Sequence, residues 1–186
     1  IAVSWVGFAS GFRVDLDQLV ARAHERNVLV FLDAIQGLGV FDLDLSRTEV
    51  DFLAADGHKW MLGPEGMGIA VVRKQHLELL RCANVGCNIV QNTFNYSDPQ
   101  LDLRNSAARF EPGSANMPGA IALSASLTIF QQIRTAHGPN AIANRILDLA
   151  GELEEKLDAI GVRTRMPPER KHRSGIVTFD VPNHDP

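Results

Sequence analysis

A lysine lies in a glycine-flanked turn directly after an apolar segment of strand length. It is Lys59 of the tetrapeptide GHKW (57–60), which follows the apolar segment 51–55. Upstream, Asp33 closes a second apolar segment, 28–32. Ligands of mostly parallel sheets bind beyond the carboxyl ends of the strands, so we expect both side chains to face one crevice. An amine and a carboxylate meeting there predict covalent catalysis, in which the lysine forms a Schiff base with a carbonyl compound.

Pyridoxal 5'-phosphate (PLP) is the cofactor whose chemistry needs this pair. Its lysine forms the Schiff base and then moves protons at the substrate Cα, while a carboxylate keeps the pyridine nitrogen protonated. Lys59 is therefore the expected catalytic residue, and Asp33 the expected partner of the ring nitrogen. Gln36, three positions after Asp33, could reach the phenolic oxygen of the ring, and His58 is a natural contact for the phosphate.

Two other kinds of site fit these residues less well. Asp56 and His58 could begin a metal site, but no third ligand follows at helical spacing, so we expect no metal. Asp33 could instead contact a ribose in a dinucleotide-binding domain. That reading needs a GxGxxG turn after the first strand, and the segment 7–11 (GFASG) lacks this spacing.

Composition sets wider limits on function. The chain has 186 residues, of which 45% are hydrophobic and 22% charged, as is usual for a globular protein. Its net charge is −4 and it has no basic block, which argues against binding to nucleic acid or to an anionic membrane. No apolar run approaches the roughly 20 residues of a membrane span. Two cysteines, Cys82 and Cys87, form no disulfide framework, so we expect a cytoplasmic protein. A start at Ile1 suggests the middle of a longer protein.

The pattern of apolar residues predicts an α/β fold. Expected strands cover 1–6, 28–32, 51–55, 68–73, 162–164 and 175–179, and expected helices cover 16–26, 75–81, a stretch after Pro118, and 142–157. The turn after Lys59 is too short for a helical crossover, so strand 68–73 should run antiparallel to strand 51–55. Residues 82–108 show little periodicity. Long helices replace strand–helix alternation near residue 120, which predicts an α/β domain over 1–120 and, over 121–186, a linker helix with the start of a small α+β domain.

Several motifs resemble the class V aminotransferase family of fold-type I PLP enzymes. They are DAIQG (33–37), DFL (51–53), GHKW (57–60), GPEG (63–66) and RFEPGS (109–114). The family includes cysteine desulfurases, selenocysteine lyases, serine-type aminotransferases and isopenicillin N epimerase-like proteins. The resemblance implies a mostly parallel, three-layer PLP-transferase large domain. It also implies that PLP binds through Lys59, Asp33, Gln36 and His58.

The resemblance also implies a partner subunit, and one residue of the chain departs from the family pattern. In the family, a Gly-Thr pair from the neighbouring subunit closes over the phosphate, and Gly113-Ser114 occupies that place here. A homodimer is therefore expected, with Ser114 completing the partner's site. Many relatives carry Ser or Thr where Asp56 stands, and a carboxylate there would repel the phosphate unless it is turned away.

The substrate class implied by the resemblance is a small amino acid. The segment 55–60 looks more like aminotransferases and epimerase-like members than like desulfurases, so an aminotransferase is the first expectation. Cysteine desulfurase, selenocysteine lyase or epimerase-type chemistry is the alternative, as is an inert fragment that binds no cofactor. Neither Cys82, Cys87 nor Arg173 has a context that marks it as a reactive group.

Overall fold

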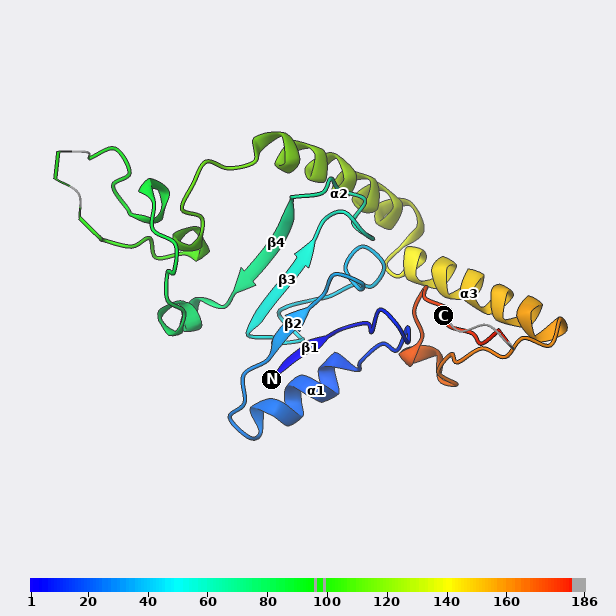
Figure 1. The fold of residues 1–186 in the computed structure, drawn as a ribbon. Coiled ribbons are helices and arrows are strands. Elements are labelled where there is room, and N and C mark those ends of the chain that lie inside the picture. The colour runs from blue at the N-terminus through cyan, green and yellow to red at the C-terminus, as the bar shows by residue number, and fades with distance from the viewer. Residues whose placement is uncertain (96, 99, 182–186) are drawn as a thin grey trace.

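The computed structural model describes residues 1–95, 97–98 and 100–181. Four strands form one mixed sheet in the order β1-β2-β3-β4 (Figure 1): β1 is Ala2–Ser4, β2 is Phe31–Asp33, β3 is Phe52–Asp56 and β4 is Gly68–Val72. β1 pairs with β2, and β2 with β3, in parallel, while β3 and β4 are antiparallel. The fold is thus α/β, as predicted, and the direction predicted for the fourth strand is confirmed.

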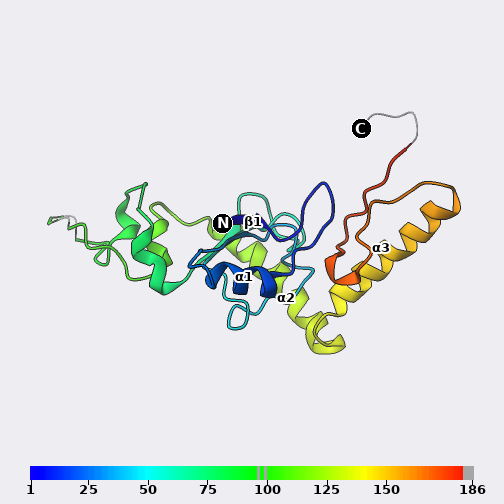
Figure 2. The same cartoon turned by 90° about the horizontal axis from the view of Figure 1, so that it is seen from below.

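Three α-helices accompany the sheet: α1 is Leu16–His24, α2 is Met117–His137 and α3 is Ala141–Ala159. Four short 3₁₀ helices are also described: η1 Lys74–Leu79, η2 Cys87–Ile89, η3 Ala107–Phe110 and η4 Arg170–His172. Asp15 begins α1 by accepting a hydrogen bond from the backbone N–H of Gln18. Figure 2 shows α3 running away from the sheet, with the C-terminal segment returning beside it. No helix among the described residues is long and apolar enough to cross a membrane.

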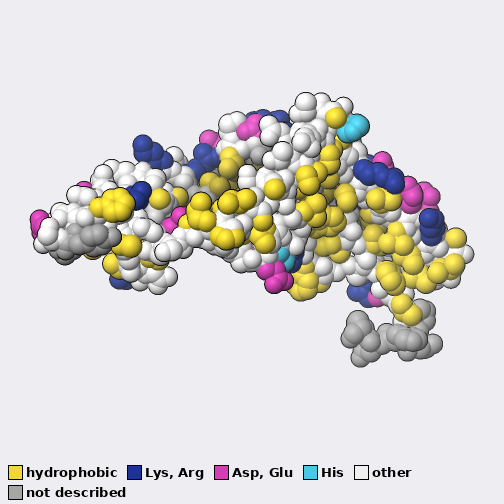
Figure 3. Space-filling model, turned by 90° about the horizontal axis from the view of Figure 1, so that it is seen from above, with side chains coloured by type: hydrophobic (Ala, Val, Ile, Leu, Met, Phe, Trp, Pro, Cys, Tyr) yellow, Lys and Arg dark blue, Asp and Glu magenta, His cyan; other side chains and the backbone are white. Residues whose placement is uncertain are grey.

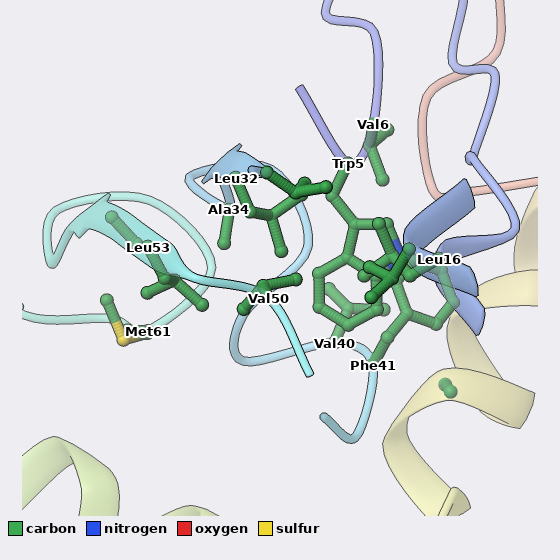
Figure 4. Packing of buried hydrophobic residues seen from close by; sticks show 14 of the residues in the cluster. Trp5, Val6, Leu16, Leu32, Ala34, Val40, Phe41, Val50, Leu53 and Met61 are labelled. Atoms are coloured by element: carbon green, nitrogen blue, oxygen red, sulfur yellow. The ribbon is translucent and has the colours of Figure 1, made fainter. Parts of the chain in front are cut away.

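One face of the sheet is buried and the other is more open. The four residues that pair across the strands on the inner face all pack into one hydrophobic core: Val3, Leu32, Leu53 and Val71. The same core holds residues of all three helices, and Figure 4 shows Leu16 of α1 beside Trp5 and Phe41. The opposite face carries Phe31 and Asp33, which remain partly accessible. The strand that was predicted to start at residue 28 starts at Phe31, because Val30 uses its N–H to bind the Asp51 side chain.

The C-terminal strands were predicted wrongly. Thr164 and Phe179 make a single antiparallel bridge, and no strand is formed over 162–164 or 175–179. Two hydrogen bonds flank that bridge, Arg165 N–H to Thr178 O at 2.7 Å and Asp180 N–H to Arg163 O at 3.2 Å. An isolated pair of extended segments is marginal, and no further strand joins it within the described part of the chain. Residues 121–181 contain the rest of α2, then α3, η4 and this bridge, and the start of a small α+β domain stays a prediction. The predicted division at residue 120 falls inside α2 and stays a prediction.

A buried carboxylate ties the base of the sheet to two helices. The Asp51 side chain is 3% exposed and accepts the N–H of Val30 at 2.7 Å. Nε2 of His24, from α1, lies 3.0 Å from this carboxylate, and Nε2 of His76, from η1, lies at 2.7 Å. Burial alone would raise the pKa of Asp51, but the hydrogen bonds from Val30, His24 and His76 outweigh it and hold the pKa below its ordinary value.

Asp51→Asn should lower the free energy of unfolding by about 1–3 kcal/mol, because the buried donors lose a charged acceptor. Since the pKa of Asp51 is lower in the folded state, its contribution is complete above the ordinary value of 3.8 and disappears as the pH falls below it. Urea unfolding as a function of pH measures both effects. Asp158→Asn, on an exposed position of α3, is the control and should change stability by less than about 0.5 kcal/mol. Equal effects of the two substitutions would contradict the role of Asp51.

Candidate active site

The ends of two parallel strands bring the predicted site residues to one edge of the sheet. Asp33 is the last residue of β2 and pairs with Ala54 of β3. β3 ends at Asp56, so the turn that contains Lys59 starts at the same edge. This pairing agrees with the expectation that the two segments lie at the ends of neighbouring strands. The side-chain roles predicted for Asp33 and Lys59 stay predictions.

Asp33 is held by two donors from its own surroundings. The Ser4 hydroxyl donates to Oδ2 at 2.9 Å, and the backbone N–H of Ile35 donates to Oδ1 at 3.1 Å. Ser4 stands directly opposite Asp33 in the β1–β2 register. Each carboxylate oxygen has two lone pairs, so both oxygens can still accept a further hydrogen bond. No role for Ser4 follows from the sequence alone, because its contact with Asp33 depends on strand register.

The turn between β3 and β4 is closed by its own backbone. The N–H of Gly57 binds Met67 O, and the N–H of Gly63 binds Gly57 O, both at 2.8 Å. A Cβ at position 57 would lie 2.5 Å from the Met67 carbonyl oxygen, so this close approach requires glycine. Leu62 has a φ of +56°, in the left-handed region that residues other than glycine rarely adopt. Its N–H binds Lys59 O at 3.0 Å, which fixes the backbone around the lysine.

Lys59 itself is partly buried, and its amine has no partner among the described residues. Within residues 1–95, 97–98 and 100–181, no side chain or carbonyl forms an ion pair or a hydrogen bond with Nζ of Lys59. A lysine that stabilised the turn would be expected to use its amine in such a contact. The arrangement instead leaves the amine available to a ligand.

Gln36 is joined to the residue that follows the lysine. The indole N–H of Trp60 donates to Gln36 Oε1 at 3.0 Å. This contact links the turn after β2 with the turn after β3, which are the two segments that the sequence singled out. Trp60 was noted in the sequence only as part of the GHKW motif, and the contact could not be found from that pattern.

Asp56 is turned towards its neighbour His58. Oδ1 of Asp56 lies 3.0 Å from Nδ1 of His58, although the geometry does not make it a hydrogen-bond partner of any described group. The His58 contact holds the pKa of Asp56 below its ordinary value, against the opposing effect of burial. Nε2 of His58 remains for a ligand. The repulsion expected between Asp56 and a phosphate is thereby reduced, because the carboxylate faces an imidazole.

A shallow cavity of about 430 Å³ opens beside Asp33. Its lining includes three acidic residues, Asp33, Asp56 and Glu111, together with residues 66–70. This lining favours a group that carries positive charge, such as a protonated pyridine. A phosphate would need His58 or donors from outside this cavity.

The predicted pair Gly113-Ser114 lies on an exposed segment just before α2. Asn88 donates its side-chain amide to Gly113 O at 2.5 Å. Asn116, two residues beyond Ser114, donates to Gly66 O at 3.2 Å, so the segment passes beside the β3–β4 turn of its own chain. Its contact with a partner subunit stays a prediction.

The chain is similar to known proteins of one family along its whole length. The class-V aminotransferase family matches residues 1–186. A probable cysteine desulfurase of Pyrococcus abyssi is 26% identical over 186 residues, which are 98% of this chain and 44% of that protein. The chain thus spans less than half the length of this relative.

Solved structures agree with this relationship. The apo structure of a cysteine desulfurase from Thermococcus onnurineus NA1 superposes with a TM-score of 0.88 at 28% identity, covering 100% of this chain and 44% of that one. The cysteine desulfurase CsdA of Escherichia coli superposes with a TM-score of 0.81, covering 99% of this chain and 43% of that one. At 23% identity, the second likeness supports the fold alone.

Proposed function

Because the chain belongs to the class-V aminotransferase family, we propose that it forms the lysine-bearing part of a PLP-dependent enzyme that transforms an amino acid. The observation that carries the proposal is the unengaged amine of Lys59 at the sheet edge where Asp33 is fixed by Ser4 and Ile35.

Three described side chains offer groups that suit different parts of PLP, although the phosphate would be bound outside the acidic cavity beside Asp33. The Asp33 carboxylate would hold a proton on the pyridine nitrogen, and the Ser4 and Ile35 contacts keep it in place. His58 offers Nε2 to the phosphate, since Nδ1 faces Asp56. Gln36 offers its amide NH₂ to the phenolic oxygen, because its Oε1 is occupied by Trp60.

Lys59 would do the chemical work of the chain. Its Nζ would bind the cofactor and, once released by an incoming amino acid, carry a proton to or from the substrate Cα. Bound PLP would supply an electron sink for the charge that develops at that carbon. The closed turn around Gly57 and Leu62 fixes the backbone from which the lysine side chain extends.

For the reaction, the relatives favour the alternative over the first expectation. The segment 55–60 suggested an aminotransferase, whereas similar proteins found by sequence and by structure are named cysteine desulfurases. We therefore propose carbon–sulfur bond cleavage of the cysteine desulfurase type. The substrate would be a small sulfur-containing amino acid.

We also propose that the working unit is a homodimer in which Ser114 reaches the phosphate of the partner's site. Exposed apolar residues of α2 next to this segment support it, since Met117 is 59% and Ile121 67% exposed. Figure 3 shows apolar side chains gathered on the side of the molecule along which α2 runs. Sedimentation velocity of the longest gene product that contains the chain, treated with PLP, should give the mass of two chains. A single-chain mass at micromolar concentration would rule out the shared site.

Borohydride reduction after incubation with PLP should attach the cofactor to Lys59, because its amine has no partner among the described residues and its turn begins at the same sheet edge as Asp33. The chain has four lysines, so peptide mapping distinguishes every outcome. The label should disappear in Lys59→Ala and persist in Lys74→Ala, which removes an exposed lysine as the matched control. Equal labelling of all four lysines would contradict the proposal. Labelling of a longer gene product but not of the 186-residue chain would show that the chain alone is inert.

Incubation of the PLP-loaded protein with cysteine and excess thiol reductant should release alanine and sulfide in equal amounts. The thiol supplies the two electrons that convert the released sulfur to sulfide. Because the chain spans less than half of its relatives, the assay needs the longest gene product that contains it. Lys59→Ala should abolish the release. Formation of a 2-oxo acid in its place would favour the aminotransferase and contradict desulfurase chemistry.

A further inference from the structure

Trp60 occupies a position between three parts of the molecule. It directly follows Lys59, and its indole N–H donates to Gln36 across the sheet edge. The other end of its ring meets the C-terminal segment, because a Cβ built on Gly175 would lie 2.8 Å from Cη2 of Trp60. The same Cβ would lie 2.8 Å from Cγ2 of Ile146 on α3, so the indole is confined at both ends.

The backbone of Trp60 is confined as well. A Cβ on Gly39 would lie 2.3 Å from the Trp60 carbonyl oxygen, and Gly39 has a φ of +96°. The turn after β2 therefore packs directly against the backbone of the turn after β3. Trp60 has little freedom to move relative to Gln36.

The direction of the Trp60–Gln36 hydrogen bond has a chemical consequence. An indole N–H can only donate, so it selects the oxygen of the Gln36 side chain and excludes its NH₂ group. Without such a partner, the two ends of a glutamine amide could exchange places by rotation. With it, the NH₂ group is directed away from Trp60 and keeps both of its N–H bonds for another acceptor.

We propose that Trp60 is a positioning residue that fixes the Gln36 amide with its NH₂ group towards the phenolic oxygen of PLP. The inference rests on the proposed function, since it assumes that PLP binds at Lys59. Trp60 acts only through Gln36 and takes no part in proton transfer. Its contact with Gly175 also couples the orientation of Gln36 to the position of the C-terminal segment.

Two substitutions separate the role of the Trp60 indole N–H from that of the Gln36 NH₂ group. Trp60→Phe keeps an aromatic ring against Gly175 but removes the donor that holds Gln36 Oε1. Gln36→Glu keeps an oxygen for Trp60 but removes the NH₂ group that the cofactor would use. A purely structural role of Trp60 predicts that only stability changes, whereas a positioning role predicts a change at the bound cofactor.

The hydrogen bond can be tested without cofactor or activity. The chain contains two tryptophans, so a ¹H–¹⁵N spectrum shows two indole signals, and Trp60→Phe assigns them. Gln36→Ala should shift the Trp60 signal and speed its hydrogen exchange about 2- to 12-fold, the range for a hydrogen bond of ordinary net strength. The signal of Trp5 serves as the internal reference. An unchanged Trp60 signal would overturn the proposal.

The effect on the cofactor is measured by titrating the absorbance of the PLP-loaded protein with pH. A donor to the phenolic oxygen stabilises its negative charge, so Trp60→Phe and Gln36→Glu should both move the titration midpoint to higher pH. In a Gln36→Ala background, Trp60→Phe should cause no further shift, because the path through Gln36 is already lost. A midpoint that moves with Gln36→Glu but not with Trp60→Phe would overturn the inference and leave PLP binding intact. Absence of PLP from Lys59 in the reduction experiment would instead overturn the proposed function.

Discussion

The parallel pairing of β2 with β3 is the constraint on which the rest of the site depends. Parallel neighbours end at the same edge of a sheet, so Asp33 and the turn that carries Lys59 meet there. The register of β1 adds Ser4 to the same edge, where its hydroxyl holds the carboxylate. A shift of β2 by one residue relative to its neighbours would turn Asp33 to the buried face and Leu32 to the open face. The hydrophobic core that receives Leu32 therefore also keeps the acid in place.

Close backbone packing then makes the site rigid. Gly57 lets the turn approach Met67, Gly39 lets the turn after β2 approach Trp60, and each approach is too close for a Cβ. The fold uses these contacts to fix the backbone and leaves the Lys59 amine and the NH₂ group of Gln36 without partners among the described residues. Both groups are thus available to a ligand at one sheet edge.

The sequence predicted the features that depend on local pattern. Apolar segments followed by Asp33 and by the GHKW turn were enough to predict neighbouring strand ends, and the short turn predicted the antiparallel β4. Features that depend on register or on distant partners were missed. The Ser4–Asp33 and Trp60–Gln36 hydrogen bonds are of this kind. The segment 175–179 has the composition of a strand but pairs only through one bridge, because composition does not supply a partner. The reaction type was judged from six residues around Lys59, and the relatives favour a different choice.

A structure of the protein crystallised with PLP tests the central claim most directly. The account predicts density continuous with Nζ of Lys59 and a pyridine nitrogen within about 2.7–3.2 Å of the Asp33 carboxylate. A cofactor bound away from Asp33, or a Lys59 side chain directed to the opposite side of the sheet from Asp33, would contradict it.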